Sequence, residues 1–285
     1  MPDENVTTPD GTEENPYLVH TWAELVDFST SGAYVKVAND IDVLAEYPDG
    51  DAPTLTLGAY IDGDNHTISR WYCTGQRYMI TTNNTGDKYI ENAIFTNIKT
   101  SYSLVYNQTS ARYGEHTAIR NCKFAGIMGD GYVFDGSGSN NNAMINGVVV
   151  NIKGNDLHLL KDYTTQNHSN CNIKLVTNAH WIYYIYANDR DQKWYDSYFD
   201  ITAPNLTSIK GGDGRVSFDN CVLDIKTVCE DFTFDTRNST ISIFNSTNAP
   251  GANGTAGKIV GVDDTHWLDA AWIADNVGFN IVEEE

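Results

Sequence analysis

A short pattern of apolar and polar positions recurs along the chain. It consists of an apolar residue, an Asn or Asp one or two positions later, a small or sulfur-containing residue, and then alternating apolar positions. The polar residue stands at Asn92, Asn121, Asn146, Asn170, Asp196 and Asn220, at steps of 29, 25, 24, 26 and 24 residues. A repeat of this length is typical of a solenoid, in which each unit buries its apolar side chains only by stacking on its neighbours.

Each repeat predicts short strands rather than helices. Its apolar residues recur at every second position, and Gly, Asn and Asp interrupt the runs before an amphipathic helix could form. A chain that returns to the same side of the molecule once per repeat pairs its strands in parallel. The sequence therefore predicts an all-β fold, a single-stranded parallel β-helix.

The repeated Asn residues predict a ladder of side-chain amides along one edge of this β-helix. Asn tolerates the left-handed backbone conformation of a sharp corner, and its amide can hydrogen-bond to the Asn one turn away, at a spacing of about 4.8 Å. The predicted ladder comprises Asn92, Asn121, Asn146, Asn170 and Asn220, with Asp196 as a substitute. The residue that follows is small in every repeat, as a chain turning inward against an identical neighbour requires: Ala93, Cys122, Gly147, Cys171, Ser197 and Cys221.

The pattern divides the single predicted domain into three parts. Residues 1–54 are expected to form an N-terminal arm and a capping segment, in which Thr21 and Glu24 have the spacing of a capping box that begins a short helix. Regular turns of β-helix occupy residues 55–248. Residues 249–285 are expected to form a strand and a short helix. Elements at the two ends would cover strands that otherwise lack a partner.

Net charge and cysteine content narrow the classes of partner and cofactor. The formal charge of −20 disfavours a nucleic-acid partner, because phosphate binding needs a basic face. Cys122, Cys171 and Cys221 share one repeat position about two turns apart, roughly 9–10 Å, which is too far for a disulfide. We expect reduced thiols that pack as small apolar side chains in a protein folded in a cytoplasm. No cofactor or metal site is predicted, although the negative charge would attract Ca²⁺.

The chain shows no signal for export or membrane insertion. Its first residues, Met1 to Glu4, lack the basic and apolar segments of a secretory signal peptide. No apolar run approaches the roughly 18 residues of a membrane span. We therefore expect neither secretion by a signal peptide nor insertion into a membrane.

Three segments resemble a known class of proteins. Residues 11–19 with the helix and strand after them, and then residues 61–68, resemble the start of right-handed parallel β-helix proteins of the pectate-lyase-like class. Residues 272–281 are similar to the terminal helix and Gly-Phe tail of that group. Such openings occur in bacteriophage virion and tail proteins and in bacterial surface proteins. The resemblance implies a right-handed β-helix and specifies no activity, since this fold carries lyases, hydrolases, adhesins and virion parts alike.

The densest aromatic zone lies between residues 181 and 199. Alternation along residues 181–186 places successive side chains on opposite sides of a strand, so that some rings must lie outside the core. Exposed Tyr and Trp can stack on sugar rings or anchor a protein partner. The residues predicted to make such a contact are Trp181, Tyr183, Tyr184, Tyr186, Trp194, Tyr195 and Tyr198.

No catalytic residue is assigned from the sequence. The polygalacturonase signatures Asn-Thr-Asp, Gly-His-Gly and Arg-Ile-Lys are absent, and the acidic residues are scattered as on a solvated surface. We therefore expect a non-enzymatic structural protein, made in a host cytoplasm and placed on the outside of a virus particle, with a bacteriophage capsid decoration protein favoured over a tail or fibre component. Its partners would be other virion proteins, contacted through the termini and an aromatic lateral face.

Two alternatives to this function stay open. The first is a tailspike-type module that binds a host surface glycan, or cleaves it as a polysaccharide lyase or glycoside hydrolase. The second is a bacterial surface adhesin. A glycan-cleaving module would need a close pair of carboxylates in a groove lined by aromatic side chains.

Overall fold

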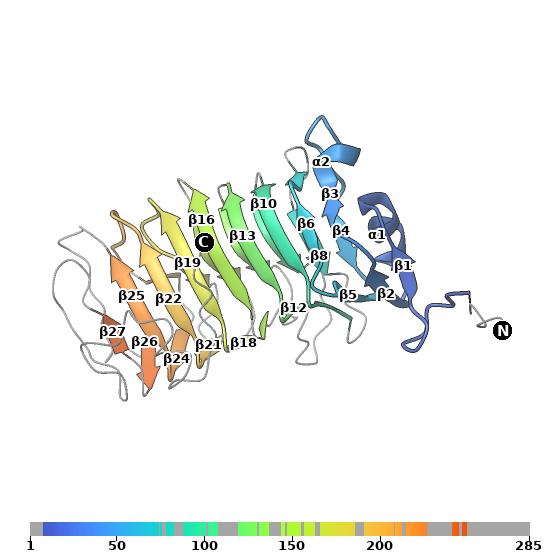
Figure 1. The fold of residues 1–285 in the computed structure, drawn as a ribbon. Coiled ribbons are helices and arrows are strands. Elements are labelled where there is room, and N and C mark those ends of the chain that lie inside the picture. The colour runs from blue at the N-terminus through green and yellow to red at the C-terminus, as the bar shows by residue number, and fades with distance from the viewer. Residues whose placement is uncertain are drawn as a thin grey trace.

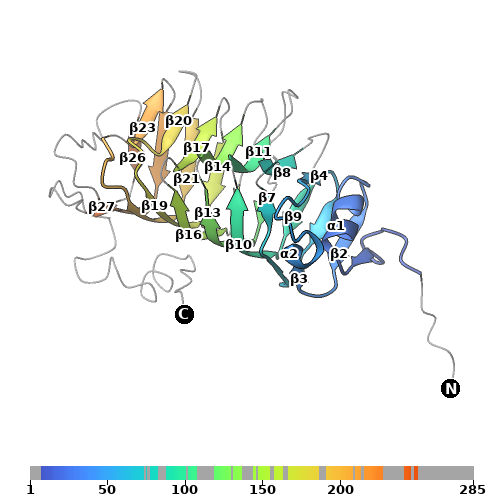
Figure 2. The ribbon, with the colours of Figure 1, turned by 90° about the horizontal axis from the view of Figure 1, so that it is seen from above.

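The computed structural model confirms the predicted parallel β-helix (Figure 1). The structure describes residues 8–73, 75, 78–82, 88–100, 102–107, 119–129, 131–136, 144–145, 147–154, 157–162, 166–185, 191–207, 209–212, 215–226, 241–244 and 247–249. Within them, neighbouring strands of successive turns pair in parallel in three sheets, which we call sheets A, B and C. Figure 2 shows the sheets forming the sides of one elongated body.

Sheets A, B and C are defined by the following strands. Sheet A contains β1 (Tyr17–Val19), β2 (Tyr34–Val37), β5 (Tyr60–Asp62), β9 (Tyr89–Glu91), β12 (Ile119–Arg120), β15 (Met144–Ile145), β18 (Gln166–Ser169), β21 (Asp191–Tyr195), β24 (Arg215–Asp219) and β26 (Ile241–Phe244). Sheet B contains β3 (Ile41–Asp42), β6 (Thr67–Ser69), β7 (Tyr72–Cys73), β10 (Ile94–Thr100), β13 (Lys123–Met128), β16 (Val148–Gly154), β19 (Asn172–Thr177), β22 (Tyr198–Thr202), β25 (Val222–Lys226) and β27 (Thr247–Ala249). Sheet C contains β4 (Leu55–Leu57), β8 (Tyr78–Thr82), β11 (Ser103–Asn107), β14 (Gly131–Gly136), β17 (Leu157–Asp162), β20 (Tyr183–Ile185) and β23 (Lys210–Gly212).

The core is a stack of aligned apolar side chains between the three sheets. Phe95 of β10 pairs in register with Phe124 of β13, and their buried rings stack with centroids 4.9 Å apart. Farther along, Phe199 of β22 and Phe218 of β24 meet edge to face at 5.5 Å. Burying a side chain of this size stabilises a fold by about 1.5–3 kcal/mol. Each turn gains this energy only from the turns above and below it.

A short helix covers the N-terminal end of the β-helix, as the capping-box spacing predicts. Helix α1 (Trp22–Phe28) begins where the Thr21 hydroxyl accepts a hydrogen bond from the Glu24 amide at 3.2 Å. It lies against β1, β2 and β4, and its buried Trp22 packs on Trp71 at 4.3 Å between ring centroids. A second helix, α2 (Val43–Glu46), begins at Val43, although a β-branched residue favours a strand by propensity. The Glu46 carboxylate accepts hydrogen bonds from two amides of the first turn of α1.

Parallel pairing extends beyond the N-terminal limit predicted for the regular turns. Strands β1 and β2 already belong to sheet A, so the winding includes residue 17, well before residue 55. Residues 250–285, with the predicted C-terminal helix and tail, lie outside the described residues. The N-terminal segment is therefore both the cap and the first part of the solenoid.

The Asn positions of the repeat lie at matching corners of successive turns. Asn92, Asn121, Asn170, Asp196 and Asn220 all have the left-handed backbone, with φ between 48° and 52°. The registers of the strands before them continue into one column. The Asn121 amide donates to Asn92 Oδ1 at 3.3 Å, and the Asn220 amide donates to Asp196 Oδ1 at 2.7 Å. Asn146 lies outside the described residues.

The small residues after these corners are buried, and three of them are thiols. Cys122, Cys171 and Cys221 are at most 1% exposed, and with Cys73 they are free cysteines. Burial raises the pKa of both Cys122 and Cys171 to about 12, and it raises that of Cys221 further. Thiols in such surroundings are poor nucleophiles. They fill space where the chain turns inward.

The corner at Asn121 gives the first testable prediction. Asn121→Ala should destabilise the protein by about 1–2 kcal/mol, because a residue with a Cβ and no local hydrogen bond strains the left-handed backbone. Asn121→Gly keeps the backbone conformation and loses only the side-chain hydrogen bond, so its loss should be smaller. Urea unfolding of the two variants beside the unchanged protein measures both. Equal losses would mean that backbone strain is not what selects Asn here.

The buried thiols give a second prediction. In the Cys229→Ser variant of the native protein, a thiol reagent such as DTNB should label none of the four remaining cysteines within minutes. After unfolding in guanidinium chloride, all four should react, because only burial protects them. Absorbance of the released chromophore counts the thiols in each state. Rapid labelling of the native variant would contradict the buried positions.

Candidate functional site

The aromatic zone predicted between residues 181 and 199 lies mostly inside the molecule. Tyr183 and Trp194 are fully buried, and Tyr198 is 8% exposed. Tyr183 meets Trp194 and Phe218 of the core with centroids 6.4 and 6.1 Å away. The predicted surface contact is therefore wrong for these three residues, because the alternation of each strand turns them toward the core or a covered face. The side chains of Tyr184 and Tyr186 lie outside the described residues.

The two remaining residues of that zone, Trp181 and Tyr195, are half-buried. The Trp181 ring stacks on His158 at 3.7 Å, and His158 in turn stacks on Tyr132 at 5.2 Å. The flat faces of these rings stack against one another along the solenoid axis. A sugar ring binds an aromatic side chain through such a face, so this stack is poorly suited to glycan binding.

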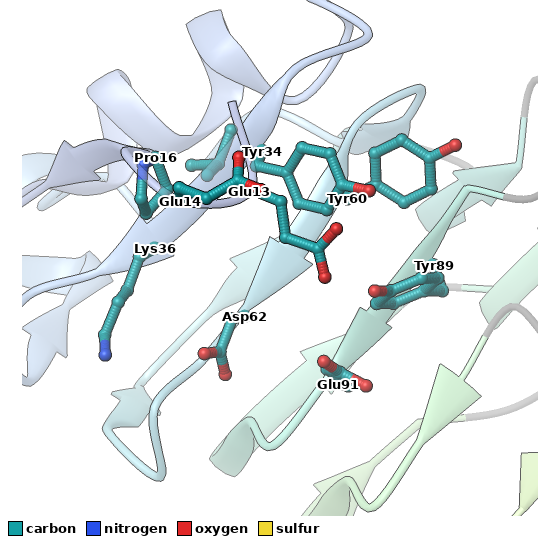
Figure 3. Close-up of a pocket in the computed structure, with 10 residues that line it drawn as sticks. Glu13, Glu14, Pro16, Tyr34, Lys36, Tyr60, Asp62, Tyr89 and Glu91 are labelled. Atoms are coloured by element: carbon teal, nitrogen blue, oxygen red, sulfur yellow. The ribbon is translucent and has the colours of Figure 1, made fainter. Parts of the chain in front are cut away.

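A surface groove lies instead at the N-terminal end of sheet A (Figure 3). Its volume is about 380 Å³, which lies in the range of small-ligand sites. Strands β2, β5 and β9 form its floor, and Glu13, Glu14 and Pro16 of the N-terminal arm, residues 8–16, form one wall. Its lining consists of Glu13, Glu14, Pro16, Tyr34, Val35, Lys36, Tyr60, Asp62, Tyr89 and Glu91.

The first component of the groove is the tyrosine column, Tyr34, Tyr60 and Tyr89. The three residues pair in register on β2, β5 and β9, while the next residue of each strand is buried in the core. Tyr34 and Tyr60 stack at 4.5 Å, and Tyr60 and Tyr89 meet edge to face at 5.3 Å. Because side chains alternate along a strand, this column lies on the outer face of sheet A.

The second component is the charged column, Lys36, Asp62, Glu91 and Arg120. These residues lie two positions after the tyrosines on β2, β5 and β9, and the column continues on β12. Two carboxylates are thus neighbours on adjacent strands, with one cation on either side. Lys36 pairs with Asp64 at 3.0 Å, and Asp62 Oδ1 accepts hydrogen bonds from the Asn92 amide group and the Asp64 backbone.

The N-terminal arm brings two further carboxylates, Glu13 and Glu14, to the groove. A tight loop holds the arm, since the amides of Asp10 and Gly11 both donate to the Asn15 carbonyl. The Gly11 carbonyl accepts from the Tyr34 amide at 2.9 Å, which ties the loop to β2. Gly11 has φ of 78°, and a Cβ there would stand 2.4 Å from the Tyr17 ring. Glycine is therefore required where the arm approaches sheet A.

The electrostatics of the groove are those of crowded negative charge. Partial burial raises the pKa of Glu91, and the adjacent Asp62 raises it further, while Arg120 acts in the opposite direction. Burial and the Glu13 carboxylate raise the pKa of Tyr34. The Tyr34 hydroxyl is therefore a protonated donor at neutral pH. The site offers hydroxyl donors, carboxylate acceptors and aromatic surface.

This arrangement is equipped for binding. Across the part of the chain that the structure describes, no group of three His, Cys, Asp or Glu side chains is positioned to hold a metal ion. In the same residues, no helix has the length and apolar character needed to cross a membrane. The groove presents carboxylates and aromatic rings on the outer face of sheet A.

The sequence analysis missed this groove, although the sequence contained a signal for it. Tyr34-Val35-Lys36, Tyr60-Ile61-Asp62 and Tyr89-Ile90-Glu91 repeat a triplet of tyrosine, β-branched residue and charged residue. The steps between the tyrosines, 26 and 29 residues, match the period of the Asn ladder. A search for repeated outward-facing positions, in addition to repeated apolar ones, finds both columns.

Comparison with known proteins supports the architecture. The crystal structure of a "putative immunoglobulin A1 protease" from Bacteroides ovatus matches the chain with a TM-score of 0.56 and 16% sequence identity, covering 85% of this chain and 86% of that one. At this identity the likeness shows a shared β-helix fold. No protein-family model matches the chain, and no curated protein matches it.

The raised pKa of Glu91 gives a third prediction. Because the folded state takes up this proton more readily than the unfolded chain, protonation of Glu91 stabilises the fold and its charge is unfavourable at neutral pH. Glu91→Gln should therefore raise the melting temperature at neutral pH. The gain should shrink as the pH falls through the folded-state pKa, which lies above the ordinary 4.5, since a protonated Glu resembles Gln. Thermal unfolding across this pH range measures the difference.

A lower melting temperature of Glu91→Gln at neutral pH would contradict this account. It would mean that the attraction between Glu91 and Arg120 outweighs burial and the repulsion from Asp62. The variant Asp49→Asn is a matched control, because it removes one negative charge at an exposed position outside the groove.

Proposed function

We propose that this chain is a non-enzymatic structural protein that docks on another protein through its lateral face. The observation that carries the proposal is the groove on sheet A. It joins three tyrosines and four carboxylates on a face whose backbone is held rigid by parallel pairing with the turns on either side. Aromatic side chains on a rigid scaffold are frequent anchors of protein contacts.

The groups of the groove favour docking over hydrolysis. Glycoside hydrolysis needs two carboxylates that are free to exchange protons with substrate and water. Here Asp62 is a structural acceptor, since its Oδ1 receives hydrogen bonds from the Asn92 side chain and the Asp64 amide. In the charged column, Glu91 has Asp62 on one side and Arg120 on the other. It therefore has no second carboxylate of that column beside it.

The setting we propose for this docking is the outside of a virus particle, with capsid decoration favoured over a tail or fibre. Its support is the resemblance of residues 11–19 and 61–68 to the opening of right-handed β-helix proteins, which occur in bacteriophage particles and also among bacterial surface proteins. These residues include β1, the wall residues Glu13, Glu14 and Pro16, and the last two residues of β5. The name of the Bacteroides ovatus protein suggests proteolysis, but a likeness of 16% identity concerns the fold and carries no activity to this chain.

A glycan-binding module, as in a tailspike or an adhesin, is the second candidate. The tyrosine column favours it, because tyrosines in line along a solenoid can follow an extended sugar chain. We rank it second because the rings do not form one flat surface along which a sugar chain could stack, since Tyr60 and Tyr89 meet edge to face. Tyr34 stacks on Tyr60, Lys88 lies 3.5 Å from the Tyr60 centroid, and Arg120 lies 4.0 Å from that of Tyr89.

Quantitative mass spectrometry of purified particles tests the proposal and is the fourth prediction. The chain should co-purify with particles through a density gradient, in a copy number comparable with that of the major capsid protein. A few copies per particle would support a tail or fibre instead. Recovery from bacterial cell surfaces with none in particles would overturn the virion setting and favour the adhesin.

A further inference from the structure

We infer that the groove on sheet A binds cationic side chains, so that the partner presents a lysine- or arginine-bearing segment of protein. This inference rests on the proposed docking function and adds the chemistry of the ligand. It depends on two features of the same groove, the surplus of carboxylates among its lining residues and the attraction of its tyrosine rings for cations.

The charges that line the groove are unbalanced. Four carboxylates line it, on Glu13, Glu14, Asp62 and Glu91, and three cations lie in or beside it, Lys36, Lys88 and Arg120. The Lys36 ammonium group is engaged by Asp64, which stands outside the groove, at 3.0 Å. The upward shift in the pKa of Glu91 reflects the same crowding, because burial and Asp62 both disfavour its charged form. A cation placed between these carboxylates would relieve their repulsion.

The tyrosine column already holds cations of this chain. The Lys88 ammonium lies 3.5 Å from the centroid of Tyr60, where it also donates to the Gly32 carbonyl at 2.8 Å. The Arg120 guanidinium lies 4.0 Å from the centroid of Tyr89. Lysine and arginine are attracted to the faces of aromatic rings. The groove therefore combines, over three adjacent strands, the two kinds of group that recognise these side chains.

Other ligand classes fit the groove less well. An anionic glycan or a phosphate would meet four carboxylates, and a neutral glycan would leave the repulsion among these carboxylates in place. A metal ion would need three ligands placed around one point, and the described residues hold no such group. A basic segment meets complementary charge along the floor and wall of the groove.

The test is a binding measurement on the full chain, and it is the fifth prediction. A fluorescein-labelled peptide of alternating arginine and glycine serves as the probe, with fluorescence anisotropy as the readout at physiological salt. The double variant Asp62→Asn/Glu91→Gln should weaken binding by about tenfold or more, since it removes two charges from the floor. Tyr60→Leu should weaken binding as well, whereas Tyr60→Phe keeps the ring and should bind nearly as the unchanged protein does.

A matched control separates the groove from the general attraction of a chain with a net charge of −20. The variant Asp27→Asn/Asp49→Asn removes the same charge at two exposed positions that do not line the groove, and its affinity should stay within about twofold. Thermal unfolding confirms that each variant is folded. Equal losses in the two double variants, or an undetectable affinity of the folded, unchanged protein, would overturn the inference. So would tighter binding of a peptide of alternating glutamate and glycine.

The inference and the proposed function can fail separately. If Asp62→Asn/Glu91→Gln still joins particles at the normal copy number while losing the peptide, the groove binds cations but is not the docking site. If the chain is absent from particles while the peptide binds as expected, the ligand class stands and the virion setting fails.

Discussion

The stacking of one turn of chain on the next is the interaction on which the rest of this structure depends. A single turn has no opposite layer against which to bury its apolar side chains, so that its core is supplied by the turns on either side. Parallel backbone pairing sets the spacing of about 4.8 Å at which these side chains meet. The stacked rings of Phe95 and Phe124 and the hydrogen bond from Asn121 to Asn92 both follow from that one register. A shift of one residue between the two turns that contain these pairs would break both.

The same register builds the groove without any separate folding signal. Once Val35, Ile61 and Ile90 are aligned in the core, their neighbours must align on the outer face. This alignment favours the tyrosines, which can pack on one another. It also forces Asp62 and Glu91 together, which no rotation of a strand can relieve while the core stays aligned. Lys36 and Arg120, one strand farther on either side, reduce the cost of that repulsion.

The fold could be predicted from the sequence because the repeated positions accept only a few residue types. Asn at a left-handed corner, followed by a small residue, leaves a clear signal with a period of 24–29 residues. The helix at Trp22 was predictable from its cap for the same reason. Boundaries were less predictable: Val43 suits a strand by propensity, yet it begins α2, where Glu46 can cap the first turn of α1.

The candidate site was harder to predict because alternation along a strand does not say which of the two sets of side chains faces the core. In the segment from Tyr183 to Trp194, either set of aromatic residues could have been outside, and the structure buries Tyr183 and Trp194. Their size made the interior the more favourable place, since large rings fill the space between sheets. In the groove, a β-branched apolar residue stands between each tyrosine and the charged residue. Because this apolar residue is the one that a strand buries, the sequence indicates that the tyrosine and the charged residue lie on the outer face.

The groove also depends on a part of the chain that no repeat specifies. Its floor is made by the solenoid, but the wall with Glu13 and Glu14 belongs to the arm, which the loop from Asp10 to Asn15 and the bond from Tyr34 to Gly11 hold in place. Half of its carboxylates are therefore positioned by local hydrogen bonds and half by long-range register. Stability of the β-helix and completeness of the groove are thus separable properties. Loosening the arm would remove one wall and two charges while leaving the stacked turns and the tyrosine column intact.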